Sequence, residues 1–146
     1  MFGRTVDLYA GRKHRAHHRD PMRPGLIFIP TRIVLTSLIV LPLAWLLPLS
    51  LATGLTGIAI YYTFASTYEW THFLIHSTYR PQSKWYKRVW RNHRLHHFRN
   101  EHYWFGVSRL FGDKVLGADP DPAQTPISPT CMTLGIESEL ADATTL

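Results

Sequence analysis

An uncharged apolar stretch dominates the pattern of the chain: residues 33–68 contain no charged side chain and no histidine. A small soluble domain seldom has such a stretch, because each of its helices needs a face in contact with water. The whole apolar zone, residues 25–79, is about twice the roughly 20 residues that one membrane helix needs. Turn-prone residues lie in its middle: Pro48, Ser50, Thr53 and Gly54. The pattern predicts an all-α integral membrane protein, with helices over residues 27–47 and 53–77 joined as a hairpin. The alternative, a buried core hairpin of a soluble protein, would need other apolar segments to cover it.

Basic residues flank the apolar zone, and none lies in the predicted turn. Six lysines and arginines lie between Arg4 and Arg23, and nine lie between Arg80 and Lys114. By the positive-inside rule we expect both termini on the cytoplasmic side of the membrane. The net charge of +6 favours an anionic lipid head group, an acyl carrier or an acidic redox protein as partner.

The C-terminal segment differs in composition from the rest of the chain. Residues 115–146 hold four of the ten prolines and five acidic residues, but no lysine or arginine. We therefore divide the chain into a membrane domain, residues 1–117, and a polar, disordered tail, residues 118–146. Deleting residues 123–146 should leave membrane insertion and metal binding intact. The single cysteine, Cys131, excludes a disulfide framework.

Eight of the nine histidines form three short boxes. The boxes consist of His14, His17 and His18; His72 and His76; and His93, His96 and His97. Positions i, i+3 and i+4 of a helix share one face, so each box should aim its imidazoles at one point. Neutral imidazole binds iron, zinc, copper and nickel. Eight ligands are too many for one zinc-type site and a natural number for two ions. The hairpin would bring all three boxes to the same membrane face.

Two further residues are candidates beside the boxes. His102 follows the third box and is either a ninth ligand or a supporting residue of the metal centre. Glu69 shares a helical face with the second box, where it could accept the free N–H of a metal-bound imidazole or bind metal directly. The alternative for Glu69 is an ion pair with Arg80 or Lys84 at the membrane edge.

Residues 84–97 are predicted to form a helix with two different faces. Its aromatic and histidine face carries Trp85, Tyr86, Val89, Trp90, His93, His96 and His97. Its basic face carries Lys84, Lys87, Arg88, Arg91 and Arg94. This pattern is typical of a helix that lies on a membrane surface. A basic helix for nucleic acid is the other interpretation, but it does not explain the spacing of the histidines.

These motifs together resemble the fatty acid hydroxylase / sterol desaturase superfamily of membrane histidine-box di-iron oxygenases. The matching stretches are K-H-R-A-H-H-R-D-P at 13–21, Y-E-W-T-H-F-L-I-H at 68–76, H-R-L-H-H-F-R-N-E-H-Y-W-F-G-V at 93–107 and G-D-K-V-L-G at 112–117. They are most similar to the branch that hydroxylates fatty acids and sphingolipids. Members of the family usually carry another histidine pair and further membrane helices before the box that begins here at His14. We therefore expect a shortened or N-terminally incomplete member.

The resemblance implies an oxidoreductase that uses O2 and two iron ions, or zinc in a purified form, to hydroxylate the acyl chain of a fatty acid or lipid. The implied metal ligands are the eight box histidines, and the implied electron donor is an external cytochrome b-type protein or ferredoxin. Alternatives are a sterol or carotenoid hydroxylase or desaturase of the same superfamily, and a non-catalytic metal-binding membrane protein. No nucleic-acid partner is expected.

Overall fold

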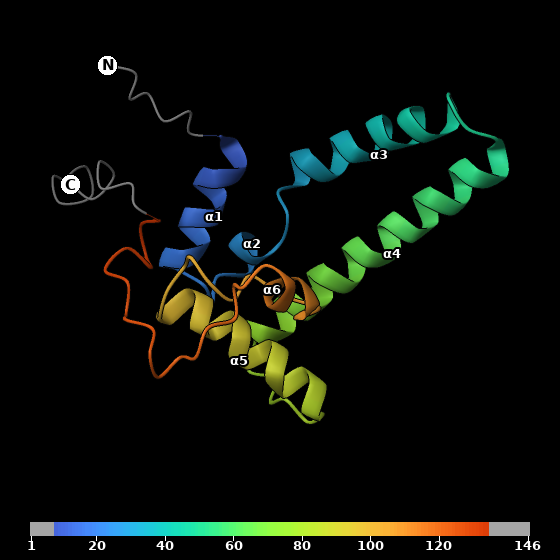
Figure 1. Ribbon diagram of the computed structural model, residues 1–146. Coiled ribbons are helices and arrows are strands. Elements are labelled where there is room, and N and C mark those ends of the chain that lie inside the picture. The colour runs from blue at the N-terminus through green and yellow to red at the C-terminus, as the bar shows by residue number, and fades with distance from the viewer. Residues whose placement is uncertain (1–7, 135–146) are drawn as a thin grey trace, which may run out of the picture.

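The computed structural model describes residues 8–134, and over that range the chain is helical with no strand. The helices are α1 (Tyr9–Arg19), α2 (Pro24–Ile27), α3 (Thr31–Leu46), α4 (Leu51–Ile75), α5 (Lys84–Phe98) and α6 (Phe111–Val115). Figure 1 shows α3 and α4 extending together away from a compact end, where α1, α2, α5, α6 and the last turns of α4 gather. The all-α prediction is therefore confirmed for the described part of the chain.

The two long helices meet at a short turn that the sequence encodes locally. The Ser50 hydroxyl caps α4 by accepting a hydrogen bond from the backbone N–H of Thr53, at 3.3 Å. Gly57 lies against the ring of Trp45, where an added Cβ would be only 1.8 Å from the ring. At Gly54 a Cβ would lie 3.0 Å from the Trp45 carbonyl oxygen. The two glycines therefore let α3 and α4 approach closely near the turn.

Most of the apolar side chains of α3 are exposed, and no residue of this helix is buried. Among the described residues, one segment, Pro24–Leu46, is long and apolar enough by length and composition to cross a membrane. The second predicted span forms a helix, Leu51–Ile75 rather than 53–77. It does not reach the same apolar character, because threonine, glycine and tyrosine are interspersed among its aliphatic residues. The membrane hairpin and its orientation stay predictions.

The compact end has a small apolar core beneath the histidines. Ile75, Tyr86, Val89 and Val107 are buried together, and Leu74, Trp90 and Leu110 pack against them. The predicted inner face of α5 is confirmed for Tyr86, Val89 and the three histidines, whereas Trp85 is exposed. Tyr86, the next residue in the same first turn, is buried, because successive helix positions face different directions.

The segment after α6 differs from the predicted disordered tail. Among residues 118–134, Ala118, Thr125, Cys131 and Thr133 are buried, and the chain passes around the end of α5 to reach α1 (Figure 1). Hydrogen bonds to Arg99, which follows α5, to the loop after it and to α1 hold this segment in place. The remainder of the predicted tail, residues 135–146, lies outside the described residues.

Candidate metal centre

Five buried histidines from three helices converge at one point. They are His17 of α1, His72 and His76 at the end of α4, and His93 and His97 of α5. Four of their Nε2 atoms form a closed ring, with separations of 3.1 Å (His17–His72), 3.1 Å (His72–His93), 3.0 Å (His93–His76) and 3.2 Å (His76–His17). The Nε2 atom of His97 lies 3.0 Å from that of His93. We call these five residues the first histidine group.

The nitrogen spacing in the first group fits a shared metal ion. One neutral imidazole carries a single N–H, which cannot satisfy the two or three Nε2 neighbours that His17, His72, His76 and His93 each have here. Two nitrogens bound about 2.1 Å from one ion lie about 3.0 Å apart when their bonds are perpendicular. The observed separations of 3.0–3.2 Å agree with that arrangement. The donor set is also chemically suitable, because imidazole is a ligand for iron and zinc.

A second histidine group lies beside the first and consists of His14, His18 and His96. The ring centroid of His18 is 4.6 Å from that of His14 and 4.9 Å from that of His96. His18 and His96 are buried, whereas His14 is exposed. The Nε2 atom of His18 is buried and has no hydrogen-bond partner among the described residues. A buried, unpaired ring nitrogen aimed at two other imidazoles is the state expected of a metal ligand shown without its ion.

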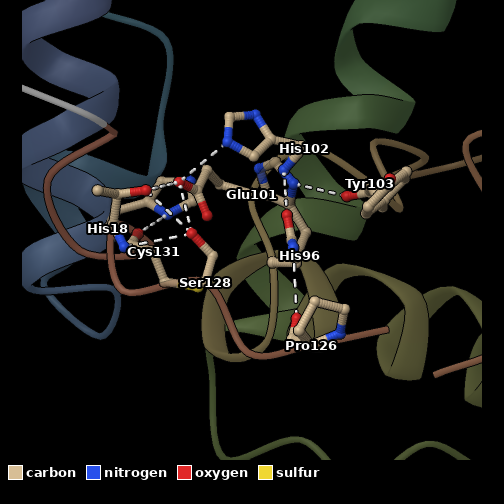
Figure 2. Close-up of polar contacts among 10 residues, drawn as sticks. His18, His96, Glu101, His102, Tyr103, Pro126, Ser128 and Cys131 are labelled. Carbon is tan, nitrogen blue, oxygen red and sulfur yellow. Dashed lines mark hydrogen bonds and ion pairs between the residues drawn. The ribbon is translucent and has the colours of Figure 1, made fainter. Parts of the chain in front are cut away.

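Three of the eight imidazoles are oriented by backbone carbonyls. Their Nδ1 atoms donate hydrogen bonds to the carbonyl oxygens of Ile27 (from His72, 2.9 Å), Tyr103 (from His96, 2.9 Å) and Cys131 (from His18, 2.8 Å). Figure 2 shows the contacts of His18 and His96. Because a carbonyl only accepts, the proton lies on Nδ1 and the Nε2 lone pair is free for a metal. Such partners fix ring orientation and raise the affinity for metal.

Burial keeps the histidines neutral at physiological pH. Burial, with further contributions from His72, His76 and other neighbouring imidazoles, lowers the pKa of His17 to about 2. Burial and the nearby His96 and His14 rings lower the pKa of His18 to about 3. The same cause lowers the pKa of His93 and His97 well below 6.5. Neutral imidazole is the form that binds metal, so the site is ready to bind at pH 7.

The metal-free chain should therefore lose stability as the pH falls below about 6.5. His17 and His18 have pKa values of about 2 and 3 in the folded chain, against the usual histidine pKa of 6.5, so the unfolded chain binds more protons at any pH between these values. For each of these two histidines, the free energy of unfolding falls by up to about 1.4 kcal/mol per pH unit below pH 6.5. Above pH 6.5 neither histidine changes the stability. Thermal unfolding of the chelator-treated chain, followed by helical circular dichroism between pH 7.5 and pH 5, measures the effect. A melting temperature that does not change over this range would contradict buried, neutral histidines.

The two additional candidates lie outside both histidine groups. The Glu69 carboxylate accepts a hydrogen bond from the backbone N–H of Ile29 at 2.9 Å, so it holds the linker between α2 and α3 rather than an imidazole. The His102 side chain is 71% exposed, and its Nε2 atom lies 3.5 Å from the Glu101 carboxylate. In the described part of the chain, neither Glu69 nor His102 forms a hydrogen bond with a box histidine. Their supporting roles at the metal centre therefore stay predictions.

The backbone carbonyls that accept hydrogen bonds from the imidazoles were not predicted from the sequence, and neither was the role of Glu101. This residue is 6% exposed, and its Oε1 atom accepts hydrogen bonds from the hydroxyls of Ser128, at 3.0 Å, and Thr130. The only signal in the sequence is that Glu101 is an acid close behind a histidine box. Backbone acceptors leave no signal, because every residue has a carbonyl.

An apolar cavity of about 370 Å³ opens beside both histidine groups. His14, His17 and His72 line it, together with apolar residues that include Leu26 and Ile33. The imidazoles are therefore next to a space that suits an apolar ligand.

An all-helical chain with two adjacent histidine groups and an exposed apolar helix has the features of a membrane-associated metal-binding protein. The chain belongs to the fatty acid hydroxylase family, whose model matches residues 5–118. It is 33% identical over 114 residues to the dihydroceramide fatty acyl 2-hydroxylase FAH2 of Arabidopsis thaliana. The match covers 73% of this chain and 45% of the plant protein, so the chain spans less than half the length of that relative. No solved structure matches the chain. The family inferred from the histidine boxes is confirmed.

Proposed function

We propose that the chain forms the metal centre of an O2-dependent di-iron membrane hydroxylase that acts on the acyl chain of a fatty acid or lipid. The observation that carries the proposal is the convergence of eight histidines in two adjacent groups, at metal-ligand spacing, beside an apolar cavity. The first group would hold one ion with five imidazoles, and the second group would hold the other with three. The pair of irons, supplied with electrons from outside, provides the O2 activation that side chains alone cannot perform. Membership of the hydroxylase family supports the acyl substrate.

The contribution of the protein residues is orientation and protection from water. The carbonyls of Ile27, Tyr103 and Cys131 hold three imidazoles with Nε2 free. Seven of the eight ligands are buried, so few water molecules reach the centre to compete with the substrate. Their burial also keeps them unprotonated, as the lowered pKa values of His17 and His18 indicate.

The acyl chain is proposed to approach from the side of α3 and α4. A second apolar cavity of about 300 Å³ lies between these helices and shares Phe28, Ile29 and Ile33 with the cavity beside the histidines. Apolar surface thus continues from the exposed helices to His14, His17 and His72. A chain taken up from a bilayer would remain in apolar surroundings until it reaches the ligands.

The electron donor is proposed to bind the outer face of α5. Five basic residues of this helix are exposed, and the helix has no acidic residue: Lys84, Lys87, Arg88, Arg91 and Arg94. The histidines lie on its opposite, buried face. An acidic cytochrome b-type protein or ferredoxin would be attracted to this surface and brought within one helix diameter of the ions. With this face and both termini on the cytoplasmic side, substrate and electrons would arrive from different directions.

Lipid analysis with isotope-labelled oxygen tests the function. Cells that express the chain and cells that express its His17→Ala variant are grown under ¹⁸O2, and their acyl chains are compared by mass spectrometry. We expect hydroxylated acyl chains carrying one ¹⁸O atom only with the unchanged chain. A purified chain that binds two metal ions but yields no hydroxylated lipid with O2, reductant and donor would instead support a non-catalytic metal-binding protein.

A further inference from the structure

Residues 125–133, which we call the strap, connect the end of α5 with the end of α1 (Figure 1). The first half of the strap is tied to Arg99, the residue after α5. The Ser128 backbone N–H donates to the Arg99 carbonyl at 2.7 Å, and the Arg99 guanidinium donates to the Thr125 carbonyl at 2.9 Å. These reciprocal bonds fix the path of the strap as it approaches the histidines.

The second half of the strap is anchored on the buried carboxylate of Glu101. The hydroxyls of Ser128 and Thr130 both donate to its Oε1 atom (Figure 2). Although burial raises the pKa of Glu101, the hydrogen bonds from Thr130 and Ser128 lower it to about 2, so the carboxylate is ionised. A buried charge is tolerated only when it is hydrogen-bonded, and here the strap supplies the hydroxyl donors.

From this anchor the strap presents its Cys131 carbonyl to the second histidine group. The carbonyl accepts the Nδ1 proton of His18 at 2.8 Å, which leaves the buried Nε2 atom of His18 aimed at His14 and His96. His96 is oriented separately, by the Tyr103 carbonyl in the loop after α5. Within the described residues, no hydrogen bond joins the strap to the first histidine group.

We propose that the strap is a positioning element for one of two metal ions: anchored on Glu101, it orients His18 and so completes the second histidine group. The proposal rests on the metal-binding role proposed above. The strap lies beyond residue 118, where the family match ends, so the family match does not account for it. The chemistry is that of an outer hydrogen-bond acceptor, which sets the tautomer and direction of a ligand without touching the metal. Loss of the anchor should weaken the second ion and spare the first. Deleting residues 123–146 would remove the strap, so the expectation that this deletion leaves metal binding intact does not hold under the proposal.

The test measures metal binding by the whole 146-residue chain in detergent, with Co²⁺ as the probe. Bound cobalt per chain is measured by elemental analysis, and the visible absorption of cobalt–imidazole sites is recorded during titration. We expect two ions with the unchanged chain. In Glu101→Ala the second ion should bind at least about 10-fold more weakly, the usual effect of losing such an acceptor, while the first keeps its affinity. Glu101→Gln retains a carbonyl acceptor and should restore most of the binding.

Two further variants separate positioning from general damage. Thr130→Val removes one anchoring hydroxyl without changing the volume much, and it should weaken the second ion in the same direction as Glu101→Ala. Asp119→Ala removes an exposed acid just before the strap and should bind both ions normally. Helical circular dichroism identifies any variant that does not fold, in which case Thr130→Val decides the question.

The outcomes distinguish this proposal from the proposed function. Two ions bound equally well by the unchanged chain, Glu101→Ala and Thr130→Val would overturn the role of the strap alone. Equal weakening of both ions in a folded Glu101→Ala chain would also overturn it, because the strap would then act on the whole site. An unchanged chain that binds no cobalt would overturn the proposed metal centre and the role of the strap with it.

Discussion

Replacing His93 by alanine should remove nearly all metal from the first histidine group and reduce hydroxylation at least about 100-fold. The Nε2 atom of His93 lies 3.0–3.1 Å from those of His72, His76 and His97, more such neighbours than any other imidazole of the group has. Without His93, the other nitrogens have no shared ligand position around one ion. Losing an outer hydrogen-bond partner of a ligand lowers metal affinity or activity by about 10–100-fold, and losing a direct ligand should lower them more. Bound metal per chain and ¹⁸O incorporation into lipid measure the two effects.

The matched control is His102→Ala, which changes a histidine whose side chain is 71% exposed. It should keep normal metal content and at least about half of the activity, since surface substitutions rarely change stability by more than 0.5 kcal/mol. His17→Ala and His97→Ala should resemble His93→Ala. A loss of only a few-fold in all three variants would contradict a shared ion, and an equal loss in His102→Ala would make His102 a ligand.

Replacing Asp113 by alanine should destabilise the chain by about 2–5 kcal/mol, because a buried side-chain donor and a part-buried backbone donor lose their acceptor. The Asp113 Oδ2 atom accepts from the Asn92 side-chain amide and from the Gly106 backbone N–H, both at 2.8 Å. Asp113 is 4% exposed, so water cannot replace these bonds. This link fastens the loop that contains the Tyr103 carbonyl against α5. Chemical unfolding followed by circular dichroism measures the loss.

Two further variants test whether the Asp113 carboxylate is what stabilises this loop. Asp119→Ala removes an exposed acid and should change stability by less than about 0.5 kcal/mol. Gly106→Ala should also destabilise, because a Cβ there would lie 2.5 Å from the Arg109 carbonyl and 2.8 Å from Asp113 Oδ2. An Asp113→Ala chain as stable as Asp119→Ala would show that the loop is held by other contacts.

Helical periodicity predicted which histidines meet, but not how they divide. Each box was expected to aim at one point, and the structure instead splits two of the boxes between the two groups. The division follows the i, i+4 spacing: His14 and His18 enter one group together, and His93 and His97 enter the other. The remaining member of each box, His17 or His96, is offset around its helix and joins the opposite group. The 3.6-residue repeat gives this offset, yet it does not say on which side of a helix an ion would lie.

The strap could not be predicted, because its contacts use groups that composition does not reveal. Prolines and acids between residues 118 and 134 are typical of a solvated segment. The composition therefore gave no indication that Thr125, Cys131 and Thr133 are buried. The contact between His18 and the Cys131 carbonyl joins positions 113 residues apart. Glu69 shows a related limit: a lone acid on a histidine face predicts a partner for an imidazole, and the sequence gives no sign that its carboxylate also accepts a hydrogen bond from the Ile29 N–H.

The separation of His18 from Cys131 also determines when the site can close during protein synthesis. A ribosome that adds about 5–20 residues per second needs roughly 6–23 s to make the 113 residues between the two partners. The other five box histidines are made during that interval, and until Cys131 follows them the His18 ring has no carbonyl to hold it. A metal ion arriving early would meet a first group with its five imidazoles and a second group still free to rotate. The second group would therefore be completed later than the first, once Cys131 has been made and has reached His18.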